Sequence, residues 1–194
     1  MKTFELSGEV RTEVGKKASK IVRKQEIVPC VLYGGNEVVH FNATFGGLRK
    51  LIYTPEIFLV NLSIGEKIYK AILKDIQFHP VSDAVLHADF LEVNEKKAIV
   101  MDVPIVLHGL AEGVKAGGKL SQEMRKLKVK ALYDKIPENL SIDVSNLGLS
   151  KTIQVGSLSF PGLEILSPVM NVVAAVKLTR AAKGAAAKAE SKEE

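Results

Sequence analysis

The sequence predicts a β-rich fold, all-β apart from a few short helices, arranged in two domains. Valine and isoleucine, which favour strands, account for 36 of the 194 residues. Short apolar or alternating segments recur between turn residues, as in proteins built from many short strands. With 46% hydrophobic and 25% charged residues, the composition is that of an ordinary globular protein.

The expected strands fall into two groups. The first group comprises residues 3–11, 29–33, 38–42, 57–62, 67–77 and 85–93. Two short helices interrupt it, near residues 16–25 and Phe45–Tyr53, and the second ends before Pro55, whose ring cannot continue a helix. The second group comprises residues 99–108, 126–132, 140–144, 152–155 and 169–178.

A polar segment over residues 93–97 separates the two groups, and we expect a domain boundary there. The predicted domains are residues 1–93 and 94–180, followed by a tail over residues 181–194. The tail is rich in Ala, Lys and Glu and has no large apolar side chain. Because it cannot bury a core, we expect it to be disordered.

Several protein classes are excluded by composition. A single cysteine, Cys30, rules out an intrachain disulfide and a cysteine-based zinc cluster. No apolar run approaches the roughly 18 residues of a membrane helix. The first ten residues, MKTFELSGEV, lack the apolar core of a secretory signal. We therefore expect a soluble, cytoplasmic protein.

The positive charge is concentrated in one short segment. The formal net charge is +5, yet residues 1–93 hold 12 basic and 11 acidic side chains. Between residues 9 and 24, six basic side chains accompany only two acidic ones. Such a basic segment on a neutral body is typical of a polyanion-binding face, although a helix face exposed to solvent has the same composition.

The helix expected at residues 16–25 separates its cations from its apolar side chains. At about 100° per residue, one narrow face carries Ala18, Ile21, Val22 and Gln25. The opposite face carries Lys16, Lys17, Lys20, Arg23 and Lys24, and Arg11 on the preceding strand extends this patch. We expect the small apolar face to dock the helix and the cations to face a phosphate backbone. A membrane is the less favoured partner, because the apolar face lacks Leu, Phe and Trp.

His87 and Asp89 form the second candidate feature. In the strand expected over residues 85–93 they point to one side, and the apolar residues beside them point to the other. A surface His–Asp pair is the simplest interpretation. A metal site would need a further histidine, and His108 is the one that follows in the sequence. The third interpretation is recognition of base edges. Asp89 would accept a hydrogen bond from the amino group of a base, and His87 would donate or accept one.

Residues 113–119 partly match a nucleotide-binding motif. The sequence Gly-Val-Lys-Ala-Gly-Gly-Lys fits the first seven positions of a P-loop. The next residue is Leu120, where magnesium coordination requires Ser or Thr. We therefore expect a glycine-rich turn with two exposed lysines.

Longer motifs resemble a known family. Residues 8–35, GEVRTEVGKKASKIVRKQEIVPCVLYGG, and residues 75–93, DIQFHPVSDAVLHADFLEV, resemble the bacterial ribosomal protein L-twenty-five family, which binds 5S ribosomal RNA. Residues 104–120, PIVLHGLAEGVKAGGKL, and residues 135–149, KIPENLSIDVSNLGL, resemble the C-terminal domain of its long form, the CTC-type or general-stress proteins. The resemblance covers about residues 3–178.

The resemblance implies an N-terminal β-barrel that binds the irregular loop E region of 5S RNA, largely from its minor-groove side, followed by a second β domain. The RNA-contacting positions of the family fall on Arg11, Lys16, Ser19, Arg23, Tyr33, His87 and Asp89. Lys20 stands where relatives can carry Arg, and lysine lacks the bidentate geometry of arginine. Residues 24–28 depart from the Gly-containing turn of many relatives and place Glu26 near the basic face, so a lower affinity is expected.

Together these features predict a structural, non-enzymatic protein of the large ribosomal subunit, located in the central protuberance. Its expected partners are 5S RNA and neighbouring ribosomal proteins, with no cofactor, metal, membrane or small-molecule substrate. Two other functions stay open. One is a metal-dependent enzyme that uses His87 and Asp89, and the other is a stress-related module that binds a protein partner.

Overall fold

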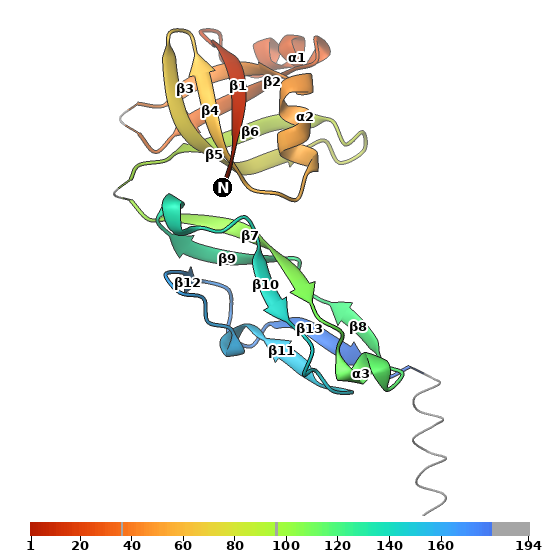
Figure 1. Cartoon of the computed structure of the whole chain (residues 1–194). Coiled ribbons are helices and arrows are strands. Elements are labelled where there is room, and N and C mark those ends of the chain that lie inside the picture. Colours follow the sequence, from red (N-terminus) through yellow and green to blue (C-terminus); the bar gives the residue numbers. More distant parts are fainter. Residues whose placement is uncertain (36, 96, 180–194) are drawn as a thin grey trace, which may run out of the picture. The chain divides into compact units, whose positions relative to one another are not determined.

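The structure is a computed structural model that describes residues 1–35, 37–95 and 97–179 (Figure 1). These residues form two compact units. The first comprises Met1–Met101 together with Leu132–Glu138, and the second comprises Asp102–Ala131 and the described residues from Asn139 onward. Both units are rich in strands, which confirms the predicted fold class. The expected disordered tail at residues 181–194 lies outside the described residues.

A closed six-stranded barrel forms most of the first unit, as the family resemblance implies. Neighbouring strands follow the order β1–β3–β2–β6–β5–β4 around the barrel. The β1–β4 and β2–β6 pairs are parallel, and the other pairs are antiparallel. The strands are β1 (Lys2–Val10), β2 (Ile27–Tyr33), β3 (Val39–Thr44), β4 (Phe58–Ile64), β5 (Lys67–Phe78) and β6 (Val85–Glu92).

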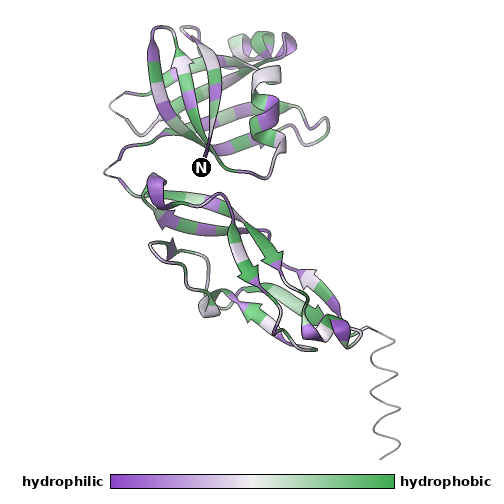
Figure 2. Cartoon of the chain, viewed as in Figure 1, coloured by the Kyte–Doolittle hydropathy of each residue, from purple (hydrophilic) through white to green (hydrophobic). Residues whose placement is uncertain are grey.

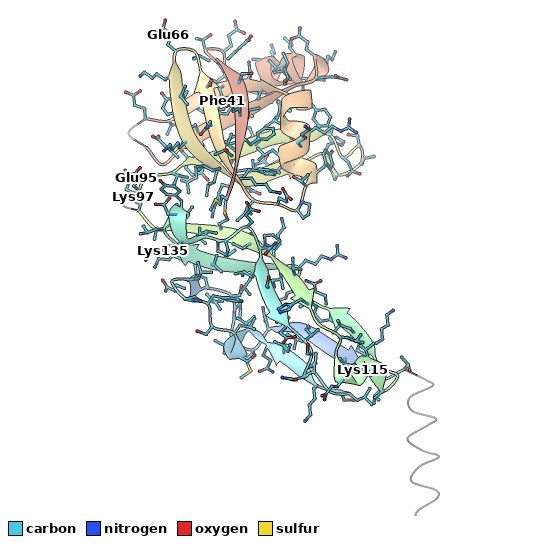
Figure 3. The ribbon with its side chains drawn as sticks, in the orientation of Figure 1. Phe41, Glu66, Glu95, Lys97, Lys115 and Lys135 are labelled. Atoms are coloured by element: carbon cyan, nitrogen blue, oxygen red, sulfur yellow. The ribbon has the colours of Figure 1, made fainter. Side chains whose placement is uncertain are left out.

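Alternate side chains of these strands fill the barrel. Cys30 and Leu32 of β2 and Ala88 and Phe90 of β6 are at most 1% exposed. Phe41 of β3 lies inside the barrel (Figure 3), and its ring centroid is 5.6 Å from that of Phe90. Apolar and polar residues alternate along the strands in Figure 2. Because strand side chains alternate between faces, the residues between the buried ones point outward and are available for binding.

Two nine-residue helices accompany the barrel, α1 (Lys16–Lys24) and α2 (Phe45–Tyr53). Helix α2 packs against the core through Leu48 and Leu51, both buried. The Thr44 hydroxyl oxygen caps its N-terminus by accepting from the Gly47 backbone N–H at 3.4 Å. Figure 1 shows α1 near the end of the barrel where β1 finishes.

The second unit holds two small sheets. Their orders are β10–β7–β9–β12 and β11–β13–β8. Ala111, Val144, Leu147 and Val176 form one of its apolar clusters. The strands are β7 (Ile99–His108), β8 (Lys119–Gln122), β9 (Lys126–Ala131), β10 (Leu140–Asp143), β11 (Thr152–Gln154), β12 (Glu164–Ile165) and β13 (Val172–Lys177). The short helical segments of this unit are α3 (Glu112–Lys115) and η2 (Val155–Ser157), whereas η1 (Tyr133–Lys135) belongs to the first unit.

The P-loop-like residues 113–119 form the end of α3, a tight turn and the first residue of β8. A Cβ atom on Gly113 would lie 2.6 Å from the Gly148 carbonyl carbon, so this glycine permits close backbone packing. Neither α3 nor β8 was expected from the sequence. Among the described residues, none of the helices has the length and apolarity needed to cross a membrane.

Candidate nucleic-acid interface

Helix α1 presents its cations to solvent. Lys16, Lys17, Lys20, Arg23 and Lys24 are all exposed. Its other face differs from the expectation, because none of the residues Lys16–Lys24, all of which the structure describes, is buried. Ala18 and Val22 are half-buried, whereas Ile21 is 61% exposed and Gln25 is exposed. The prediction that Ile21 helps to dock the helix is therefore wrong, whereas Ala18 and Val22 are partly covered. A helical period shows which residues share a face, and does not show whether another element covers them.

Polar contacts replace apolar docking at the start of α1. Gly15 precedes the helix with φ of 117°, a conformation that favours glycine. The Ser19 hydroxyl donates to the Gly15 carbonyl at 2.8 Å and accepts from Arg11 Nη2 at 2.9 Å. Arg11 Nε donates to the Glu13 carbonyl at 2.7 Å. Arg11 and Ser19, both expected to contact RNA, thus bind each other and join the end of β1 to α1.

Arg23 joins the other end of α1 to the barrel wall. Its Nε donates to the Leu86 carbonyl oxygen at 2.9 Å, across 63 positions of sequence. Leu86 lies on β6 immediately before His87. The contact therefore brings the cationic helix beside the strand that carries the His–Asp pair. Arg23 belongs to α1 and contacts β6 directly.

The turn after α1 is closed by Glu26. This residue has φ of 58°, in the left-handed region, where a glycine has no steric cost. Its N–H donates to the Arg23 carbonyl at 3.3 Å, and its carbonyl accepts from the Phe45 N–H at 3.0 Å. The Glu26 side chain is exposed at the end of the basic helix. It adds one negative charge next to the cations.

His87 and Asp89 form a hydrogen-bonded pair on β6. His87 Nδ1 and Asp89 Oδ1 are 2.6 Å apart, and the two side chains are 26% and 27% exposed. An ionised carboxylate only accepts, so Nδ1 carries the proton of this bond. In the neutral ring Nε2 is then an acceptor, and protonation turns it into a donor. The pair holds an imidazole in a fixed orientation at the barrel surface.

Tyr33 lies at the end of β2, the strand next to β6. The parallel register pairs Val31 with Asp89 and Tyr33 with Leu91. Burial raises the pKa of the Tyr33 phenol above its ordinary value, and the negative charges of Asp89 and Asp75 raise it further. The phenol therefore stays protonated at neutral pH and can donate a hydrogen bond close to both carboxylates.

Asp75 and Gln77 on β5 belong to the same region, and the sequence reasoning missed them. The antiparallel register pairs Asp75 with Asp89 and Gln77 with His87. Both side chains are exposed, and a bulge separates Leu73 from Asp75. Their segment alternates between faces like any strand. Only the pairing of β5 with β6 places these polar groups beside the His–Asp pair.

The metal-site interpretation of His87 and Asp89 needs a third ligand. His87 and Asp89 are paired with each other, while His108 ends β7. Within residues 1–35, 37–95 and 97–179, no group of three His, Cys, Asp or Glu side chains is placed to hold a metal ion.

Two family models match successive parts of the chain. The sequence model of the ribosomal L25p family matches residues 6–90. The model of the C-terminal domain of ribosomal protein TL5 matches residues 98–180. The family consists of structural ribosomal proteins and not of enzymes.

Three similar proteins are each named large ribosomal subunit protein bL25. The protein of Porphyromonas gingivalis strain W83 is 62% identical over 190 residues, covering 97% of this chain and 99% of its own length. That of Azobacteroides pseudotrichonymphae is 60% identical over 184 residues, covering 94% and 97%. That of Bacteroides thetaiotaomicron is 59% identical over 194 residues, covering 97% and 99%. The chain therefore belongs to the ribosomal L25p family, in the long form with a TL5-type C-terminal domain, and is a structural protein of the large ribosomal subunit.

Proposed function

We propose that the chain binds the loop E region of 5S ribosomal RNA in the central protuberance of the large subunit, in cytoplasmic ribosomes. Residues 1–93 act as the RNA-binding domain, residues 94–180 form the second β domain, and the chain lies beside neighbouring ribosomal proteins. The observation that carries the proposal is the 2.9 Å bond from Arg23 Nε to the Leu86 carbonyl. It joins a cationic helix to a strand with oriented polar side chains, so phosphate binding and base recognition occur on adjacent elements.

Affinity in this proposal comes from α1. Lys16, Lys20 and Arg23 are exposed and neutralise phosphates, releasing counterions from the RNA. Ser19 acts through Arg11, because its hydroxyl oxygen accepts the Arg11 Nη2–H. A guanidinium held in this way presents a preset plane to a base edge or a 2′-hydroxyl.

Specificity in this proposal comes from the barrel surface over β2 and β6. Asp89 accepts an amino or hydroxyl proton, and His87 Nε2 pairs with a 2′-hydroxyl. Tyr33 donates from its phenol or stacks on a base. A carboxylate beside RNA is unfavourable unless it meets a specific donor. Asp89 therefore rejects regular helices, whose phosphates approach it, and tolerates an irregular loop that offers exposed base edges.

The test is a gel shift of the full chain with 5S RNA across a salt series. A second RNA, with the loop E sequence scrambled, serves as the control. We expect tighter binding to 5S RNA at every salt concentration, with affinity falling steeply as salt rises because phosphate contacts are lost. Equal affinity for the two RNAs would contradict recognition of loop E.

Asp89→Ala tests the specificity surface. The change should weaken binding to 5S RNA by about 1–3 kcal/mol and reduce the preference over the scrambled RNA, because a base-edge acceptor is lost. The salt dependence should stay near that of the wild type. Asp102→Ala, at an exposed aspartate of β7, is the matched control. Wild-type discrimination by the Asp89 variant would show that this carboxylate does not read the RNA.

A further inference from the structure

Two carboxylates lie side by side on the barrel surface next to His87. Asp75 on β5 and Asp89 on β6 are partners in the antiparallel register. Burial raises the pKa of the Tyr33 phenol on β2, and the negative charges of both carboxylates raise it further, so both lie near that phenol. Like charges directly opposite each other on a sheet are unfavourable. Across the described residues, no lysine or arginine forms an ion pair with Asp75 or Asp89, so the repulsion is not relieved by a permanent cation.

His87 is placed to supply a positive charge at this surface. Its Nδ1 atom is 2.6 Å from Asp89 Oδ1, and its register partner on β5 is Gln77, two residues from Asp75. Diagonal neighbours on adjacent strands are about 7–8 Å apart, within the range of a charge–charge interaction. An imidazole gains or loses its proton between about pH 5 and pH 8. Because Nδ1 is held by Asp89, Nε2 is the ring nitrogen left for the RNA.

The charge on His87 depends on groups from every element beside it. These groups are Asp89 on β6, Asp75 and the neutral Gln77 on β5, the phenol of Tyr33 on β2, and Arg23, which joins α1 to β6. The two carboxylates favour a protonated ring, and the guanidinium opposes it. Bound RNA changes this balance, because its phosphates neutralise the guanidinium and add further negative charge. Protonation of the ring is therefore more favourable in the complex than in the free protein.

We propose that His87 binds the RNA as an imidazolium, with Nδ1–H donating to Asp89 and Nε2–H donating to an acceptor atom of the RNA, and that binding takes up one proton from solution. The inference rests on the proposed RNA binding and specifies which class of RNA atom His87 recognises. Acceptors on the minor-groove side of RNA are the 2′-hydroxyl oxygen and the N3 and O2 atoms of bases. An amino group, which only donates, is excluded at Nε2 and is left to Asp89.

Calorimetric titration of the full chain with 5S RNA tests the proton uptake. Two buffers with different heats of ionisation are compared at about pH 7, and the difference in heat counts the protons taken up. We expect an uptake of up to about one proton per complex. Since the complex holds more protons than its separate components, the affinity should fall as the pH rises. We expect about tenfold weaker binding at pH 8 than at pH 6, which corresponds to a difference of about one pH unit between the two titrations.

His87→Gln keeps a side chain that donates and accepts hydrogen bonds but cannot gain a proton. This variant should bind without proton uptake and with nearly equal affinity at the two pH values. His40→Gln is the matched control, because His40 is an exposed histidine on β3, the other neighbour of β2. It should keep the wild-type proton uptake. Asp75→Asn removes one carboxylate from the surface and should reduce the change in affinity between pH 6 and pH 8 to about threefold.

The outcomes separate the inference from the proposed function. If the wild type binds 5S RNA without taking up a proton, or if the uptake persists in His87→Gln, the imidazolium is wrong while the proposed function stands. An unchanged pH effect in Asp75→Asn would contradict the part assigned to the pair of carboxylates. If the wild type does not bind 5S RNA at either pH, the proposed function fails and the inference fails with it.

Discussion

Helices α1 and α2 have the same length but are held to the barrel by different kinds of interaction. Each spans nine residues beside the same barrel. Helix α2 buries Leu48 and Leu51 and carries a threonine N-cap, whereas α1 buries no residue of its fully described span and has no side-chain cap. Instead α1 is held by Arg11, Ser19 and Arg23, which bond to one another or to backbone carbonyls.

This difference in packing suggests that α2 serves mainly the stability of the barrel and α1 serves mainly binding. A short isolated helix is marginal in water, and like charges on one face weaken it further. Helix α2 overcomes this by apolar burial, which fixes it in the core. Helix α1 depends on a few hydrogen bonds, so its cations stay free for a polyanion. Changes in α2 should therefore affect folding, and changes in α1 should affect binding.

The largest expected effect is on folding. Leu48→Ala should lower the free energy of unfolding of the first unit by about 2–5 kcal/mol, because the leucine is fully buried and leaves a cavity. Ile21→Ala in α1 should change it by less than about 0.5 kcal/mol. All four tyrosines belong to the first unit, so tyrosine fluorescence during urea unfolding reports on it. If the free energy of unfolding falls by similar amounts in the two variants, α1 and α2 contribute equally to stability and the distinction between a structural and a binding helix is wrong.

The next effect is on RNA affinity. Arg23→Ala should weaken binding by about 1–2 kcal/mol and reduce the salt slope by about one, since a phosphate contact and the tether to Leu86 are both lost. Arg23→Lys keeps the charge but has no Nε donor, so it should preserve the slope while losing part of the affinity.

The matched control for Arg23 lies in α2. Arg49→Ala removes an exposed arginine from that helix and should leave RNA binding unchanged. A loss of affinity in the Arg49 variant as large as in the Arg23 variant would mean that net charge alone, and not the position of α1, determines binding. Gel shifts across the same salt series measure all three variants.

The smallest expected effect comes from replacing a glycine by alanine at each helix. The free energy of unfolding should fall for one of these variants and rise for the other. Gly15→Ala should destabilise the first unit by about 1 kcal/mol, because φ of 117° disfavours a side chain even with open space around it. Gly46→Ala in α2 should stabilise it by up to about 1 kcal/mol, since that glycine is helical and exposed, with no atom near a new Cβ. Urea unfolding of both variants measures the difference. The same sign for both changes would show that helix propensity dominates at both positions.

Much of the fold was accessible from the sequence. Alternation predicted the six barrel strands, and Pro55 marked the end of α2. The strands β8 and β12 were missed because they are four and two residues long and form through pairing with β13 and β9. Such pairing depends on tertiary context, which a local pattern does not contain.

Local features of the candidate site were predicted from the sequence, but the contacts between its elements were not. The residue types of α1 and the shared face of His87 and Asp89 follow from local periodicity. The bond from Arg23 to Leu86 spans 63 positions, and the placement of Asp75 beside Asp89 depends on strand register. Neither follows from spacing along the chain. Whether the predicted residues contact RNA stays a prediction that the variants above can test.

Cys30 gives the first unit an internal reporter of its opening motions. The thiol is 1% exposed, and burial, the largest cause, raises its pKa to about 12. At neutral pH it is therefore neither ionised nor accessible to alkylating reagents. As the single cysteine of the chain, it reacts only when an opening motion of the first unit exposes it. Its modification rate thus measures how often the barrel wall opens, without any added label.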